Sequence, residues 1–253
     1  MKTLLTTNTK LRKDPTGQSW RVKGLTLAPH RSSGRQVCPM ATRGCAAACV
    51  LEHVGLSNYQ SVKDARQRKT DLWFDDRDRF LELLWNDVAT HERRCAKRGE
   101  RCAVRLNVAS DILWEHHFPA LFASFHSVTF YDYTKRPRRR TPQNYHLTYS
   151  WSERDVADNG TTARSELRHG RNVCIVTSAL YNAQQGTYGA LPKTITIGSQ
   201  RYRTVDGDTH DIRVPELDGQ SRAVLLRFKG NKARKIEAIE SGFVRRVRHT
   251  IAS

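Results

Sequence analysis

Six short apolar segments, spread along the chain and separated by polar stretches with helical periodicity, constrain the fold more than any other feature. They start at Val22, Val104, Val128, Tyr145, Asn172 and Ala223. Short strands that alternate with amphipathic helices are typical of parallel sheets whose strands are joined by crossover helices. The sequence therefore predicts an α/β fold with about six parallel strands.

The longest helix-like stretch covers residues 62–97, where apolar residues recur at helical spacing between charged ones. Acidic residues favour the start of a helix, so we expect this stretch to break near Asp75 and Asp76. Shorter helices are expected at residues 46–53, at residues 118–125 and within residues 152–169.

The last third of the chain has a different character. Residues 194–197 and 202–205 flank a polar turn that starts at Gly198, which predicts a β-hairpin. A complete eight-unit α/β barrel needs about 250 residues, so a chain of 253 residues that also contains a hairpin fits a partial barrel better. The sequence shows no internal repeat and no linker. We therefore expect residues 1–253 to form one domain, an open, partial α/β barrel with an added C-terminal β-hairpin.

The chain is strongly basic. It has 43 Lys and Arg residues against 25 Asp and Glu residues, a formal net charge of +18, which exceeds what solubility requires. This excess indicates a polyanionic partner, so we expect nucleic acid and in particular DNA; the alternative is a basic surface that is only solvated. The residues expected to contact phosphates form the densest basic run, namely Lys135, Arg136, Arg138, Arg139 and Arg140.

A cytoplasmic location is expected from what the sequence does not contain. No stretch approaches the roughly 18 consecutive apolar residues of a membrane span, and the first residues lack the apolar core of a secretory signal. In a reducing cytoplasm the six cysteines are expected as thiols. Cys95, Cys102 and Cys174 stand apart from one another, and we interpret them as small buried apolar residues.

Cys38, Cys45 and Cys49 fall within a dozen residues, directly after the first predicted strand. Three thiolates on one loop can hold a metal ion or an iron–sulfur cluster and leave one coordination position open for a reactant. The alternatives are a structural zinc site completed by His30 or His53, or no metal at all.

Polar side chains gather where the predicted strands end, which is where α/β folds bind their ligands. The candidate catalytic residues are Asp111, Asp132 and Glu115, whose carboxyl groups suit acid–base chemistry. The candidate cofactor-binding residues are Asn107, Ser110 and Ser150. We expect the two aspartates and the three thiols to open onto a common cavity.

Two further groups of residues have a structural and a functional interpretation. Trp114, Tyr131, Tyr133 and Trp151 near the strand ends can stack on a base, although core packing is the commoner role for aromatic residues. Residues 206–211, with the sequence Asp-Gly-Asp-Thr-His-Asp, have the oxygen ligands of a metal site, but we interpret them as a turn whose aspartates accept backbone hydrogen bonds.

Several blocks of the sequence are long enough to compare with known families. They lie at residues 27–29, 37–49, 104–115, 130–137, 144–148, 206–213 and 241–244. These blocks resemble a bacteriophage family named after gene product eighty-eight, over nearly the whole chain. The resemblance implies a phage protein that works in the cytoplasm of a host cell.

A looser resemblance is to radical S-adenosylmethionine enzymes, which carry three cysteines on the loop after the first strand of a partial α/β barrel. In those enzymes three and then two residues separate the cysteines, whereas six and then three separate them here. The resemblance implies that Cys38, Cys45 and Cys49 ligate three irons of a four-iron cluster, and that the fourth iron binds the methionyl end of S-adenosylmethionine.

These observations predict an enzyme that modifies nucleic acid or a nucleotide with an iron–sulfur cluster and S-adenosylmethionine. A first alternative is a transglycosylase that inserts a 7-deazaguanine base into DNA, in which Asp111 and Asp132 act on the sugar and the base beside a zinc site. A second alternative is a nucleic-acid-binding protein with a metal-stapled fold and no catalysis.

Overall fold

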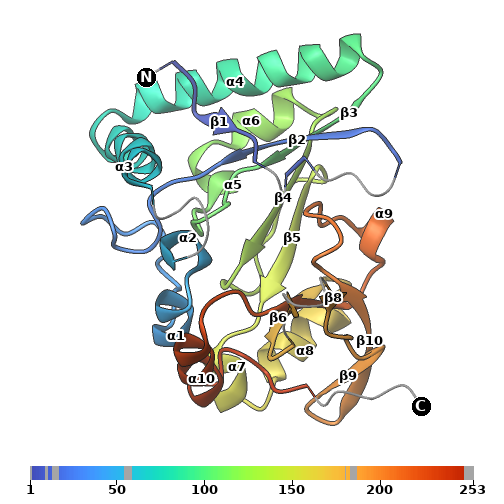
Figure 1. Cartoon of the computed structure of the whole chain (residues 1–253). Helices are drawn as coiled ribbons and strands as arrows, with labels where there is room; N and C mark the ends of the chain where they lie inside the picture. Colours follow the sequence, from blue (N-terminus) through green and yellow to red (C-terminus); the bar gives the residue numbers. More distant parts are fainter. Residues whose placement is uncertain are drawn as a thin grey trace.

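The protein is built around one mixed sheet of nine strands (Figure 1). The computed structural model describes residues 2–8, 11–12, 17–53, 59–179, 181–182 and 187–247. The strands, in their order across the sheet, are β1 (Leu5–Thr6), β2 (Trp20–Leu25), β3 (Arg101–Arg105), β4 (Thr129–Thr134), β5 (Tyr145–Ser150), β6 (Val173–Thr177), β11 (Ala223–Arg227), β10 (Gln200–Asp206) and β9 (Thr194–Ile197).

The six predicted strands are confirmed as β2, β3, β4, β5, β6 and β11, and each pairs in parallel with the next in chain order. The predicted hairpin is β9 with β10, which pair antiparallel. It does not stand apart from the sheet, because β10 also pairs in parallel with β11. With β1 and β9 as its two edges the sheet is open, and the strand pairing does not establish the predicted six-strand partial barrel as such.

Helices lie in each connection between consecutive parallel strands except the one from β4 to β5, and a last helix follows β11. Their bounds are α1 (Arg43–Ala47), α2 (Val50–His53), α3 (Gln60–Asp75), α4 (Arg77–Lys97), α5 (Trp114–His117), α6 (Pro119–Ser124), α7 (Glu153–Ala157), α8 (Thr161–Arg168), α9 (Pro215–Asp218) and α10 (Lys232–Glu240). Two short strands, β7 (Tyr181–Asn182) and β8 (Thr187–Tyr188), form a separate pair. Among the described residues, no helix is both long and apolar enough to cross a bilayer.

The predicted helix break at Asp75 and Asp76 is confirmed, because the Asp76 side chain caps α4 by accepting a hydrogen bond from the Arg79 backbone N–H at 3.0 Å. Two other predicted helices are each divided. Residues 46–53 are expected as one helix, but α1 and α2 are separate, and residues 152–169 form α7 and α8. Gly160, with a φ of 72°, makes the turn between α7 and α8 in the left-handed region that glycine favours.

The sheet buries side chains on both faces. On β3, Val104 belongs to the core cluster that also contains Phe80 and Val88 of α4, whereas its neighbour Ala103 belongs to a second cluster with Ile212 and Val214. This alternation is the expected consequence of the two-residue period of a strand. One face is therefore covered by helices, and the other by the segment that links β10 to α9. Figure 1 shows α4 along the β1–β3 end of the sheet, and α1 beside α10 at the lower left.

The segment from Asp206 to Asp211 has the turn role that we infer for it. Asp206 and Asp208 both pair with the Arg227 guanidinium, at 2.9 and 3.2 Å, which fastens the turn to β11. Asp211 accepts hydrogen bonds from Arg105 at 3.0 Å and from the Tyr131 hydroxyl at 2.8 Å. These contacts hold the segment against the sheet through ion pairs instead of leaving its carboxylates free for a cation.

Candidate functional site

The cysteine loop packs against the segment that follows the next strand of the sheet. The Asp111 backbone N–H donates to the Val37 carbonyl at 2.9 Å, and the Cys38 thiol donates to the Ala109 carbonyl at 3.1 Å. The loop after β2 and the loop after β3 are therefore joined at the carboxyl edge of the sheet, as we expect for a site at the strand ends.

The three thiols of the loop differ in their local setting. Cys45 lies in α1, which Thr42 caps by accepting a hydrogen bond from the Cys45 N–H at 3.3 Å. Cys49 lies between α1 and α2. Burial, together with the nearby cysteines, raises the pKa of Cys38 to about 12 and that of Cys49 to about 11. Without a cation both thiols are protonated at neutral pH, and a bound cation would favour their thiolate forms.

The distances between the thiols bear on whether they can bind a single zinc ion or a larger metal group. In tetrahedral zinc sites the ligand sulfurs lie about 3.8 Å apart, given Zn–S bonds of about 2.3 Å. Among the described side chains, no three of Cys38, Cys45, Cys49 and His30 have ligand atoms that all lie within 4.8 Å of one another. The His30 ring instead contacts the Gln36 side chain. The His53 side chain lies outside the described residues.

Asp111 joins the segment after β3 to the end of β4. Its carboxylate accepts hydrogen bonds from the Thr134 hydroxyl at 2.7 Å and from the Lys135 backbone N–H at 2.9 Å, and it pairs with Arg139 at 3.3 Å. The two carboxylate oxygens of Glu115 accept hydrogen bonds from the same guanidinium, at 2.8 and 2.6 Å. A forked ion pair of this kind fixes the positions of both partners.

The basic run after β4 divides into an interior and a surface part. The Arg139 side chain is only 2 % exposed and serves the two carboxylates, so the phosphate contact predicted for it does not fit its position. Arg136, Arg138 and Arg140 are exposed. Lys135 is half-buried, and its ammonium donates to the Ser150 hydroxyl at 2.9 Å and to the Trp151 carbonyl at 3.3 Å. These contacts connect the ends of β4 and β5.

Asp132 is completely buried beneath these groups. Its carboxyl group accepts hydrogen bonds from the Asn107 backbone N–H at 2.7 Å and from the Tyr145 hydroxyl at 2.9 Å. Burial raises the pKa of Asp132 to about 7. It therefore lies within the predicted cluster but has no exposed atom with which to touch a substrate.

Asn107 and Ser110 shape the segment after β3. The Asn107 side-chain oxygen accepts hydrogen bonds from the Ser110 hydroxyl at 2.7 Å, from the Ile112 N–H at 3.0 Å and from the Trp114 indole at 3.1 Å. Asn107 is 2 % exposed, so it holds a turn in place and does not face a cofactor. Trp114 is fully buried against Trp73, which confirms core packing as its role.

Residues 241–244, the last of the blocks that resemble the phage family, also contribute to the carboxyl edge of the sheet. The Gly44 N–H donates to Glu153 at 2.5 Å, and a side chain at Gly44 would come within 2.9 Å of the Phe243 Cβ. Lys135 lies over the Phe243 ring at 5.2 Å. Phe243 and Tyr145 are site residues that we did not select from the sequence, although both lie in blocks that resemble the phage family.

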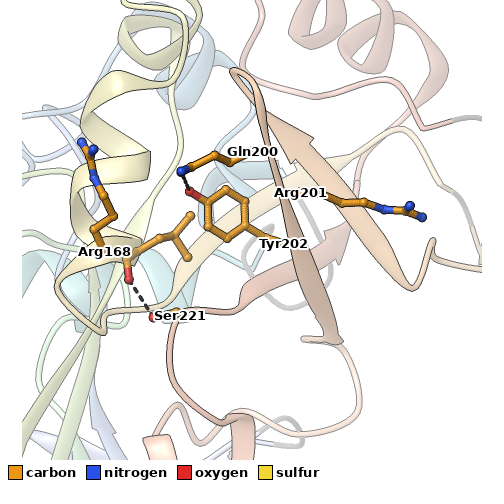
Figure 2. A pocket seen from close by; sticks show the side chains of 6 residues that line it. Arg168, Gln200, Arg201, Tyr202 and Ser221 are labelled. Carbon is orange, nitrogen blue, oxygen red and sulfur yellow. Dashed lines mark hydrogen bonds between the residues drawn. The ribbon is translucent and has the colours of Figure 1, made fainter.

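Two hollows on the described part of the surface are lined by other residues than the thiols and the two aspartates. One hollow of about 410 Å³ lies between α8 and the hairpin and is lined by Arg168, Tyr202 and Ser221, among others (Figure 2). A second of about 200 Å³ lies beside Trp151 and Arg245. The predicted common cavity stays a prediction: the structure joins the thiol loop to the Asp111 segment through the Val37 and Cys38 contacts, and it buries Asp132.

A second set of possible metal ligands lies elsewhere in the molecule. His91, Cys95 and Cys102 are buried, and one ligand atom from each lies within 4.8 Å of the other two, so the group can hold a metal ion. The sequence interpretation of Cys95 and Cys102 as buried is confirmed. It missed their association, because His91 and Cys95 meet Cys102 only when α4 packs on β3.

The comparisons with known proteins give a family. A family model described as gene product 88 matches residues 2–246, which include the cysteine loop, the strand-end segments and the block around Phe243. Comparison with curated proteins finds no match, and neither does comparison with solved structures. The chain therefore belongs to the gene product 88 family, the bacteriophage family that its sequence blocks resemble.

Proposed function

We propose that this protein is an enzyme that modifies nucleic acid or a nucleotide, and that Cys38, Cys45 and Cys49 hold an iron–sulfur cluster that binds S-adenosylmethionine. The observation that carries the proposal is topological. The cysteine loop leaves the first of six parallel strands in chain order, and it packs on the segment after the second. A loop in this position can present a reactive group at the strand ends, where α/β folds bind ligands.

The donor set suits a cluster better than a single zinc ion. A cluster spreads its cysteine ligands over several metal atoms, so the sulfurs need not meet within the distance that one zinc requires. Cys38 and Cys49 are half-buried thiols whose pKa values are raised by burial and by neighbouring cysteines, and a cationic group would relieve the repulsion between their thiolate forms. When bound, such a cluster supplies an electron for the cleavage of S-adenosylmethionine.

The carboxylate cluster acts in this proposal as a support. Asp111 fixes the turn against which Cys38 packs, and Arg139 joins Asp111 to Glu115. Asp111, Glu115 and Asp132 are then positioning residues and not groups that touch the substrate. The exposed Arg136, Arg138 and Arg140 extend from the same edge and suit contact with phosphates.

The transglycosylase alternative requires a carboxylate that can attack the sugar. Asp132 has no exposed surface, and Asp111 already accepts two hydrogen bonds and an ion pair. A nucleophile in that reaction must reach the anomeric carbon, so the observed contacts favour the cluster-based function over base exchange.

The first test is anaerobic purification and reconstitution with iron and sulfide. We expect about four irons per chain, an electron paramagnetic resonance signal after reduction that changes when S-adenosylmethionine is added, and loss of both in Cys45→Ala. The half-buried Cys45 leaves little volume behind when it becomes alanine.

The matched control is Cys174→Ala, since Cys174 is a buried thiol on β6 outside the cysteine loop. This variant is expected to keep its iron. Iron that survives Cys45→Ala, or zinc in place of iron in the wild-type protein, would contradict the proposal. Comparison of nucleosides from DNA incubated with the loaded protein and with Cys45→Ala then separates an enzyme from a binding protein.

A further inference from the structure

The group formed by His91, Cys95 and Cys102 lies apart from the cysteine loop. His91 and Cys95 are four residues apart on the last turns of α4, and Cys102 is the second residue of β3. Their exposed fractions are 5, 2 and 7 %. Cys102 lies at the amino end of its strand, and the candidate site lies at the carboxyl end. The two groups of thiols therefore cannot serve one metal.

The tautomer of His91 follows from its contacts. Its Nε2 atom lies 3.1 Å from the Arg21 carbonyl and 3.3 Å from the Ala103 carbonyl, and because carbonyls only accept, Nε2 carries the proton. With the proton on Nε2, the Nδ1 atom of the neutral ring carries the lone pair, and this atom faces the Cys95 thiol. Metal-bound histidines commonly donate their other N–H to a carbonyl in this way.

The distances suit a single zinc ion. Nδ1 of His91 lies 3.7 Å from the Cys95 sulfur. Tetrahedral zinc with Zn–S of about 2.3 Å and Zn–N of about 2.05 Å separates these two atoms by about 3.6 Å. Two thiolates and a neutral imidazole also balance the charge of Zn²⁺, which matters because a buried net charge is costly. A singly charged metal would leave an excess negative charge.

We propose that His91, Cys95 and Cys102 bind a zinc ion that fastens the C-terminal end of α4 to the start of β3. Three protein ligands leave the fourth position of the zinc to a water molecule. Zinc binds the thiolate forms of Cys95 and Cys102, so its binding releases the protons of both thiols. The role is structural and independent of the function proposed above.

The test uses a Cys38→Ser/Cys45→Ser/Cys49→Ser variant, which removes the cysteine loop as a source of metal. We expect this variant to retain about one zinc per chain, and cobalt substitution to give a thiolate-to-cobalt charge-transfer absorption. Adding Cys102→Ser is expected to abolish the zinc and the absorption. Adding Cys174→Ser, the matched buried thiol, is expected to leave both unchanged.

X-ray absorption of the zinc-loaded triple variant needs no change in the site and so does not depend on how Cys102→Ser folds. Two sulfurs at about 2.3 Å and one histidine nitrogen at about 2.0–2.1 Å would support the proposal. A triple variant without zinc or charge-transfer absorption overturns it, and so does a disulfide between Cys95 and Cys102 in place of bound metal.

Discussion

Arg139 shows what a residue's neighbours in the sequence cannot reveal. It lies in a run of basic residues, and the run predicts contact with phosphates for all of them. In the structure Arg138 adopts a φ of 57°, and Arg139 is buried against Glu115 while Arg138 and Arg140 are exposed. A backbone in the left-handed region is uncommon for a residue other than glycine, so no pattern of charges predicts which arginine is buried.

Asp132 gives a prediction at the same scale, because its pKa differs between the folded and unfolded chain. The folded protein holds the proton up to about pH 7, whereas an unfolded aspartate loses it near pH 4. The stability contributed by the protonated group is complete below pH 4 and is lost as the pH rises to 7. Relative to Asp132→Asn, the wild-type free energy of unfolding is expected to fall by up to roughly 4 kcal/mol across that range.

Urea denaturation of both proteins at several pH values measures this difference. Asp78→Asn, at an exposed position on α4, serves as the control and is expected to follow the wild-type curve closely. A constant difference between wild type and Asp132→Asn from pH 4 to pH 7 would mean that Asp132 keeps an ordinary pKa in the folded protein.

At the scale of secondary-structure elements, the sequence predicts whether a segment is a helix or a strand better than it predicts where one helix ends and the next begins. The break between α3 and α4 has a local cause in Asp76 and is visible in the sequence. The division at Cys49 is not visible, because α1 owes its position to Glu153 and Phe243, which lie far away in the chain. Periodicity reports local preference, and tertiary contacts decide where these short helices stop.

The prediction at the scale of elements concerns Gly44. A methyl group there would come too close to Glu153, Ser241 and the Phe243 Cβ, so Gly44→Ala is expected to push α1 away from α10. We expect a loss of about 1–3 kcal/mol in the free energy of unfolding and a lower iron content after reconstitution. Calorimetry and metal analysis measure both. The control is Arg43→Ala, an exposed position in the same helix, whose iron content is expected to match that of the wild type. An iron content in Gly44→Ala equal to that of the wild type would show that other contacts hold α1.

At the scale of the whole molecule, the parallel order of six strands follows from the alternation of apolar and helix-like segments, and the pairings confirm it. The two-residue edge strand β1 is too short to leave a pattern. The hairpin is visible in the sequence, but its parallel pairing with β11 depends on the ion pairs of Asp206 and Asp208 with Arg227. Those pairs join residues about twenty positions apart and have no periodic signal.

The exposed basic surface gives the prediction for the whole molecule. If Arg136, Arg138 and Arg140 contact phosphates, replacing all three with alanine removes up to three ionic contacts and is expected to lower the slope of log Kd against log salt by about 2–3. Fluorescence anisotropy with labelled DNA measures the slope. The control, Arg93→Ala/Arg94→Ala/Lys97→Ala on the exposed side of α4, removes the same charge elsewhere. Equal slopes in the two variants would assign the binding to diffuse charge.

The contact between α1 and the block around Phe243 also orders events during synthesis. The cysteine helix emerges from the ribosome well before Ser241 and Phe243, which form part of the surface on which it rests. The surroundings of Cys45 are therefore complete only after Phe243 has been translated, and a prosthetic group bound by Cys45 would gain these surroundings only after that point.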